Sequence, residues 1–436
     1  AEYVAKTPKI YPVFMSAFKC SPDSFIISYF KELLDNHQKP YLVLQIDEHG
    51  SDGGYSTRVE AAIETFRTHY QQSTTVSHVE PSPRTFQALQ KRGTILVPNY
   101  DSLGCTLMCA VFERAGYRSL LIEETPTTVT SSLRLNDGQC LPVSSIVQGA
   151  IETIEKYELK PEESTLFIVV DRLACNFPQY PLMMKKLLEQ RGSGFENVKV
   201  CAAELETGIL PSDVVYEGYL AFLLGGLLRR IGCRLRPYER NPGQADRLIG
   251  EARNRLYDCI VAGASKEQVF KEIVAEFRRI PINGSLGTRP KVAILGDLYV
   301  RDNDTFNQQL IGALEDYGAE VVTAPFSFYF RLSMNVAYHS LWTEGQYLSA
   351  VKGQFWMKVL STFEKRFYQL AKNVLDEGFP AVDDSILNHL KRYHLAIFHS
   401  GETATNLLKI FSMLNHYPDI SLFVHVNPIF CCPGLV

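Results

Sequence analysis

Short apolar runs alternate with longer segments of helical period along most of this chain. The short runs are rich in Val, Ile, Leu and Tyr, which is typical of buried strands. We predict such strands at 11–18, 41–47, 94–98, 119–123, 165–170 and 198–203. The intervening helices are predicted at 24–34, 58–70, 106–115, 143–157 and 182–190. This alternation favours an α/β fold with parallel sheets flanked by helices.

A helical segment separates this series from a second α/β unit. Its helices are predicted at 212–230, 244–262 and 266–279, and the turn-rich stretch 283–290 resembles a linker. The second unit has strands at 291–295, 320–324, 394–398 and 421–426, and helices at 304–317, 332–375 and 402–414. We therefore predict a multidomain protein: an α/β region at 1–206, a helical segment with linker at 207–289, and a second α/β domain at 290–436, truncated at its C-terminal end. The chain is expected to be an excised part of a longer protein.

Composition narrows the function classes. A net charge of −4 gives no basic footprint for nucleic acid, and the pairs Arg229-Arg230 and Arg278-Arg279 are expected on solvated helix faces. The longest apolar run, 219–228, is shorter than the roughly 20 residues that span a bilayer, so it predicts a buried helix. We expect a cytoplasmic protein without a membrane partner, whose ten cysteines serve metal binding or core packing.

Several cysteines stand at the predicted starts of helices. Cys20, Cys140 and Cys175 each precede a helix, and the pair Cys431-Cys432 follows an apolar run. Helix N-termini stabilise thiolates, and three thiolates from separate loops are enough to hold a [4Fe-4S] cubane. The alternative is that each is a small buried residue. Cys105 and Cys109 lie one helical turn apart and are more typical of core packing.

Other candidate sites are weaker. Glu48 and His49 end a strand and are candidates for proton transfer, although a capped polar loop explains them as well. The loops 296–299 and 400–402 are candidates for binding an anion through backbone N–H groups. The sequence contains neither a P-loop nor a dinucleotide-binding fingerprint.

Four stretches of the chain together resemble one known group of proteins. They are Phe18-Lys-Cys-Ser-Pro-Asp-Ser-Phe25, Ile46-Asp-Glu-His49 with Thr57-Arg-Val-Glu-Ala61, Gly138-Gln-Cys-Leu-Pro142 and Asn427-Pro-Ile-Phe-Cys-Cys-Pro-Gly434. In these stretches the chain resembles the 2-hydroxyacyl-CoA dehydratase superfamily. The chain looks most like the dehydratase-like portion of the large fused CoA-substrate-specific enzyme activases. Double-cubane cluster reductases belong to the same superfamily, and the resemblance covers nearly the whole chain.

The resemblance implies a cofactor and partners. A [4Fe-4S] cluster would be held by Cys20, Cys140 and Cys175. Cys431 or Cys432 is a candidate for an extra ligand, which would serve a second cubane in a double-cubane arrangement. An actin-like ATPase activator, on the same polypeptide or a separate protein, would inject one low-potential electron into the cluster. An acyl-CoA thioester would then be reduced to a ketyl radical and dehydrated, or another difficult reduction carried out. No ATPase motif is present in this chain.

We therefore expect the iron–sulfur component of an ATP-activated dehydratase or activase system of anaerobic metabolism. Whether it is a dehydratase-like enzyme or a double-cubane-type reductase stays open, and so does homodimer formation. The cluster is expected to be lost from protein prepared in air. Two alternatives remain: a cluster-free scaffold that docks the ATPase activator to a dehydratase, and a two-lobed module that binds a small anion.

Overall fold

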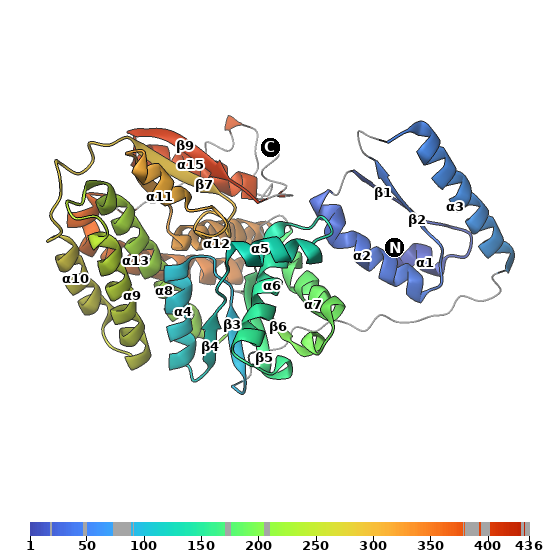
Figure 1. The fold of residues 1–436 in the computed structure, drawn as a ribbon, viewed down its shortest axis with the longest axis horizontal. Helices are drawn as coiled ribbons and strands as arrows, with labels where there is room; N and C mark the ends of the chain where they lie inside the picture. Colours follow the sequence, from blue (N-terminus) through green and yellow to red (C-terminus); the bar gives the residue numbers. More distant parts are fainter. Residues whose placement is uncertain are drawn as a thin grey trace.

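The computed structural model describes residues 1–17, 20–46, 50–72, 89, 91–170, 176–204, 210–377, 379, 392–393, 402–428 and 431. Within these residues the strands form separate sheets whose neighbouring strands are all parallel, and helices flank them (Figure 1). The predicted α/β class is confirmed. The predicted strand 394–398 lies outside the described residues. No helix in the described part of the chain combines the length and apolarity needed to cross a bilayer.

The N-terminal unit, residues 1–72, has a two-stranded sheet. Strand β1 (Val13–Ala17) pairs with β2 (Leu42–Ile46), and α1 (Glu2–Lys6), α2 (Ser21–Asn36) and α3 (Asp52–Gln72) accompany them. Helix α2 lies on the side of this unit that faces the rest of the molecule (Figure 1). Its Phe25 is buried and stacks on Tyr180, with ring centroids 5.9 Å apart. This contact fixes α2 against the neighbouring unit.

The central unit contains the four-stranded sheet β4-β3-β5-β6. Its strands are β3 (Thr94–Val97), β4 (Arg118–Leu121), β5 (Ser164–Val170) and β6 (Lys199–Glu204), and its helices are α4 (Ser102–Arg114), α5 (Pro126–Ser132), α6 (Leu141–Lys156) and α7 (Tyr180–Arg191). Strand β3 is buried along its whole length, as expected for a parallel sheet covered on both faces. Short 3-10 helices, found at Leu133–Leu135, Pro161–Glu163, Phe177–Gln179, Phe195–Asn197 and Arg236–Tyr238, connect elements here and in the following segment.

Helix α8 (Ser212–Leu235) joins the central unit to the rest of the chain, and α9 (Gln244–Ala262) and α10 (Lys266–Phe277) follow it. The apolar run 219–228 is buried, as predicted. The expectation of a solvated Arg229-Arg230 pair is wrong, because both side chains are buried. Arg229 donates to Asp101 at 2.7 Å, and Arg230 donates to Glu377 at 2.7 Å. Buried charges require such partners, so these arginines tie α8 to both of its neighbours. Arg278 and Arg279 are exposed, as expected.

The C-terminal unit contains the sheet β8-β7-β9. Its strands are β7 (Lys291–Gly296), β8 (Glu320–Thr323) and β9 (Ile420–Val426), and its helices are α11 (Leu310–Asp316), α12 (Phe326–Thr343), α13 (Tyr347–Leu375) and α15 (Glu402–His416). The helix predicted at 304–317 is correct only from Leu310 onward. The Asn303 side chain accepts hydrogen bonds from the Thr305 and Phe306 N–H groups, which holds the earlier residues in turns.

Candidate metal centre

Cys140 occupies the N-cap position of α6. The turn before it is held by Asn136, whose side chain accepts from the Gly138 N–H and donates to the Gln139 carbonyl at 2.8 Å each. Gly138 has φ +104°, a conformation that favours glycine. Pro142 fits the first turn of the helix, where its missing N–H costs nothing. The local sequence therefore places the Cys140 thiol at the positive end of a helix dipole.

Asp297 and Cys431 come from the ends of two paired strands. Strands β7 and β9 are neighbours, with Gly296 opposite Val426 in the register. The Asp297 N–H donates to the Val426 carbonyl at 2.9 Å. A Cβ atom at Gly296 would lie 1.9 Å from that carbonyl oxygen, so only glycine allows this approach. Because the carboxyl ends of parallel strands share one edge of the sheet, Asp297 and residues 427–428 emerge together.

These three residues form one buried group. The Cys140 and Cys431 sulfurs and an Asp297 carboxylate oxygen all lie within 4.8 Å of one another, and this arrangement is able to hold a metal ion. Cys140 belongs to the central unit, whereas Asp297 and Cys431 belong to the C-terminal unit. Two thiols and a carboxyl group are common ligands of zinc and iron. A cation at this point would join two units that are far apart in the sequence.

The ionisable groups of this buried site have shifted pKa values. The pKa of the Cys140 thiol is raised because it hydrogen-bonds with Cys431, because it is buried, and because it faces Asp297. Burial also raises the pKa of Asp297, while hydrogen bonds from the Val300 and Tyr299 N–H groups act against that shift. These N–H groups donate to the Asp297 side chain at 2.9 and 2.8 Å. Thiols lose their protons when they bind a metal ion, so a cation that binds here would displace the proton of Cys140.

The same hydrogen bonds bear on the prediction that the loop 296–299 binds an anion. The loop 296–299 was a candidate for binding an anion through its backbone, but the Tyr299 N–H is already bound by the Asp297 carboxylate, which would repel an anion. That expectation is wrong. The loop instead presents Asp297 to the two thiols. The second candidate of this kind, 400–402, lies outside the described residues except for Glu402.

Cys20 does not belong to the Cys140–Asp297–Cys431 group among the described residues. It nevertheless begins α2 as Cys140 begins α6. The N-cap backbone angles are φ −48° and ψ 125° at Cys20, and φ −49° and ψ 124° at Cys140. Each cysteine has a proline two residues later. The two Cys-x-Pro segments thus share one local structure, as their similar sequences predict.

The remaining predicted site residues are Cys175, Cys432, Glu48 and His49, and all four lie outside the described residues. The structure therefore leaves their proposed roles as predictions. Cys105, Cys109 and Cys201 are buried in the apolar core, in agreement with packing roles. Burial raises the pKa of the Cys109 and Cys201 thiols to about 11 each.

Asp297 was missed as a ligand. The sequence signal was present, because an acidic residue directly after a buried strand and a glycine is a common ligand position at a sheet edge. What the sequence did not give was the pairing of β7 with β9. That pairing brings Asp297 to the segment of Cys431.

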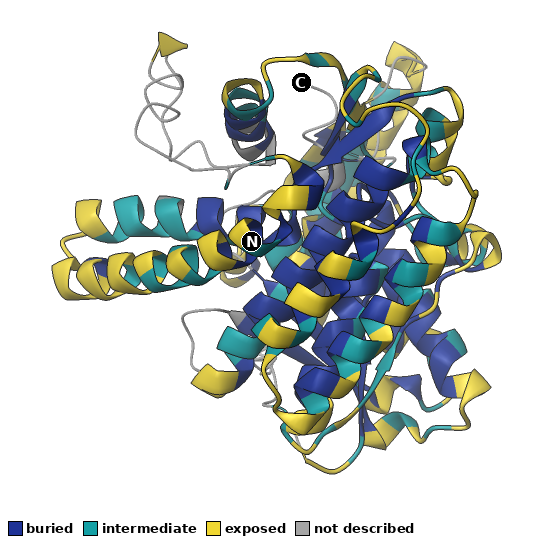
Figure 2. Cartoon of the chain, turned by 90° about the vertical axis from the view of Figure 1, so that its left-hand side faces the viewer, coloured by how far each residue is buried: buried dark blue, intermediate teal, exposed yellow. Residues whose placement is uncertain are grey.

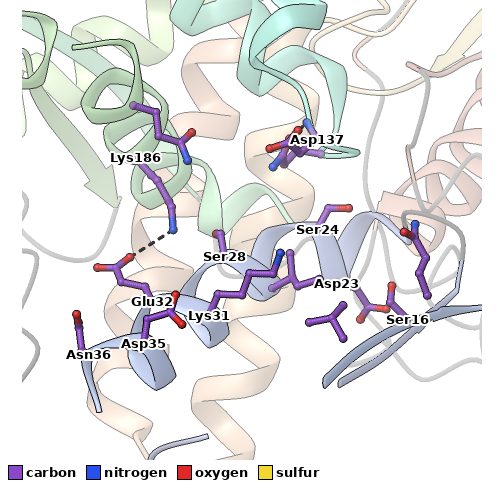
Figure 3. Close-up of a pocket in the computed structure, with 15 residues that line it drawn as sticks. Ser16, Asp23, Ser24, Ser28, Lys31, Glu32, Asp35, Asn36, Asp137 and Lys186 are labelled. Carbon is purple, nitrogen blue, oxygen red and sulfur yellow. Dashed lines mark hydrogen bonds and ion pairs between the residues drawn. The ribbon is translucent and has the colours of Figure 1, made fainter. Parts of the chain in front are cut away.

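A groove of about 720 Å³ lies between the N-terminal and central units (Figure 3). Helix α2 and strands β1 and β2 line one side, and the loop before Cys140 and helix α7 line the other. Its charged residues are Lys31 and Lys186 against Asp23, Glu32, Asp35 and Asp137. Lys186 donates to Glu32 at 3.3 Å across the groove. The acidic excess does not favour a small anionic ligand here.

Comparison with known proteins adds no family to this description. Neither the scan against protein-family models nor the search of curated proteins finds a match to the chain.

Proposed function

We propose that this protein is the iron–sulfur component of an ATP-activated system of the 2-hydroxyacyl-CoA dehydratase and activase type. The observation that carries the proposal is that the buried side chains of Cys140, Cys431 and Asp297 lie close together. These thiols come from segments almost 300 positions apart, and core packing alone does not require them to meet beside a carboxyl group. This proposal implies two partners, an actin-like ATPase activator and an acyl-CoA substrate.

The local structure around Cys20 supports the same proposal. Helix α2 packs against α7 through the Phe25–Tyr180 stack, and Tyr180 in turn hydrogen-bonds with Cys140. The groove next to these helices is lined by Ser24, one helical turn after Cys20, and by Gln139, directly before Cys140. The start of α2 therefore lies on the same side of the central unit as Cys140. A movement of α2 that carried Cys20 to Cys140 would add a third thiol to the site.

The donor set fits iron. A bound [4Fe-4S] cluster would supply one-electron transfer at low potential. Cys140 and Cys431 would hold it, and the N–H groups at the start of α6 would stabilise the thiolate charge. Asp297 keeps its carboxylate toward the thiols because its other contacts are to the 299–300 backbone. Burial of all three residues excludes water from the bound group.

A second candidate, a site for one structural metal ion, is favoured by the spacing of the ligand atoms. All three lie within 4.8 Å, which suits a single tetrahedral ion. A cubane places iron and sulfide atoms between its ligand sulfurs, so Cys140 and Cys431 would have to separate to hold one. The two candidates differ in metal stoichiometry and in acid-labile sulfide.

Anaerobic reconstitution with iron and sulfide tests the proposal. We expect about four irons and four sulfides per chain, with an electron paramagnetic resonance signal after reduction. Cys140→Ser should lose most of this iron, while the core variant Cys201→Ser should keep it. One metal ion without sulfide would establish the structural site instead. Less than one metal ion of any kind per chain after reconstitution would overturn both and leave the cluster-free scaffold.

A further inference from the structure

Helices α12 and α13 form an antiparallel hairpin whose far part stands away from the body of the protein (Figure 2). The near part is firmly anchored. Glu364 of α13 is buried, and its carboxylate accepts from Tyr219 at 2.9 Å and from Ser327 at 3.0 Å. Arg331 of α12 also pairs with Glu364 at 2.8 Å. The far part, residues 338–358, thus projects from a rigid base.

Helix α13 has two apolar faces on opposite sides. One face carries Ala350, Met357, Glu364 and Phe367 at helical spacing, and its buried members pack toward the body and α12. Leu348, Val351 and Phe355 repeat at i, i+3 and i+7 on the opposite face. At 3.6 residues per turn the two faces point in nearly opposite directions. A second apolar face is available for packing against a further partner.

No residue in the described part of the chain covers the second face. Leu348 is 82% exposed, Val351 56% and Phe355 63%. Trp342 and Tyr347 lie beside them, are at least half exposed, and contact each other with ring centroids 5.0 Å apart. Together these five side chains expose on the order of 600 Å² of mostly apolar surface. A patch of this size is at the upper end of what monomeric proteins expose, and patches of this kind are often functional.

We propose that this face, the α13 seam of Leu348, Val351 and Phe355, binds the same seam of a second copy of the chain. The seam is self-complementary about a two-fold axis that passes between Val351 and Lys352. In an antiparallel pair around that axis, Leu348 packs on the partner's Phe355, and Phe355 on the partner's Leu348. A two-fold contact requires this reciprocity. The exposed area comes close to the roughly 800 Å² that each partner contributes to a standard interface.

The charges at the ends of the seam agree with the same axis. The pairing that joins Leu348 to Phe355 also brings Lys358 next to the turn 344–346 of the second copy. Glu344 is the acidic residue of that turn, and both Glu344 and Lys358 are exposed. Each dimer would therefore gain two ion pairs, each between Lys358 of one copy and Glu344 of the other. Lys352 flanks the seam, where its aliphatic stem covers apolar surface and its ammonium group stays in water.

Light scattering after size-exclusion chromatography tests the proposal on the full chain. At tens of micromolar we expect a mass near twice the 49.2 kDa of one chain. Val351→Glu and Phe355→Glu should each shift the protein to a monomer without changing its thermal midpoint by more than a few degrees. Tyr317→Glu is the matched control, because Tyr317 is 93% exposed but lies at the end of α11, and it should remain dimeric.

A charge exchange tests the orientation. Lys358→Glu and Glu344→Lys should each weaken dimerisation about two- to fivefold, as expected for an exposed ion pair. The double variant should return to within about twofold of the native dissociation constant. A native protein that stays monomeric at 100 µM overturns the proposal, and so does a dimer that both seam variants leave intact. Failure of the double variant to recover rejects the antiparallel two-fold arrangement.

Discussion

Hydrogen bonding and burial both act on protonation at the metal centre. The hydrogen bond with Cys431, followed by burial, raises the pKa of the Cys140 thiol, and burial raises the pKa of the Asp297 carboxyl group. Thiols must lose their protons to bind a metal ion, so metal binding and proton release are linked. A cation that enters the site is therefore expected to release the proton of the Cys140 thiol.

This linkage makes metal affinity depend on pH. We expect the affinity for Co²⁺, followed by its thiolate charge-transfer absorption, to rise about tenfold or more per pH unit between pH 6 and 8. Proton release, measured with an indicator in weak buffer, should be at least one per bound ion. Cys140→Ser should lose the absorption, whereas Cys201→Ser should retain it. Equal affinity at both ends of this range would contradict thiolate ligation.

Glu124 is a second buried acid with a measurable consequence. Burial raises its pKa from 4.5 to about 7, although its carboxylate accepts hydrogen bonds from Ser145 at 2.9 Å and Asn303 at 2.7 Å. The folded protein binds the proton more tightly than the unfolded chain. The contribution of Glu124 to stability is therefore complete below pH 4.5 and is lost as the pH rises to about 7, by about 3 kcal/mol.

Glu124→Gln removes this titration while it keeps an oxygen for Asn303. We expect the native protein to lose stability relative to this variant between pH 5 and 7, in urea unfolding monitored by circular dichroism. Below pH 4.5 the two proteins should differ little. Asp137→Asn, a change in the exposed loop, is the control and should follow the native profile. A constant difference between native protein and Glu124→Gln across this range would mean that Glu124 stays charged.

Most elements of the fold follow from local sequence pattern. The described strands begin and end within about two residues of their predicted positions, because a buried parallel strand is a continuous apolar run between polar turns. Helix α9 coincides with its prediction, since Gly263 ends it with φ +68°. The prediction is wrong at 304–309, where the Asn303 and Asn307 side chains bind backbone N–H groups that a helix would use differently.

The contact between α4 and α8 depends on a pair of glycines that sequence pattern does not reveal. A Cβ atom at Gly225 would lie 2.4 Å from the Gly104 backbone nitrogen. Gly225→Ala should therefore push the two helices apart and lower the free energy of unfolding by about 3 kcal/mol. Urea unfolding measures this loss.

Gly250→Ala is the matched control for this change. Gly250 also lies within a helix, but nothing would touch its Cβ atom within 4 Å. Alanine there should leave stability unchanged or increase it by up to about 1 kcal/mol, because alanine has the higher helix propensity. Similar losses in both variants would mean that helix propensity, and not the close approach of α4 and α8, determines the effect.

At the scale of the whole molecule, the sequence did not show how the sheets are placed against one another, and the predicted α/β region 1–206 contains two separate sheets. Local pattern showed Cys140 and Cys431 as candidates, yet their meeting depends on the placement of one sheet against another. The same limit applies to Arg229 and Arg230. An arginine pair usually marks a solvated face, and only the acids of two neighbouring units, such as Asp101 and Glu377, make its burial favourable. Asp297 was missed for the same reason.

Because the metal centre spans two units, a bound ion should stabilise the whole fold. Zn²⁺ at 100 times its dissociation constant is expected to add about 2.7 kcal/mol to the free energy of unfolding, and a chelator should remove it. Asp297→Asn keeps an oxygen for the Tyr299 and Val300 N–H groups but loses the charge, so we expect a native thermal midpoint without metal and a smaller increase with it. Asp316→Asn, on the exposed end of α11, should respond as the native protein does.

Cys140→Ser distinguishes an ion that bridges the two units from one bound elsewhere. If Zn²⁺ still raises the thermal midpoint of this variant by the native amount, the Cys140–Asp297–Cys431 group does not connect the two units.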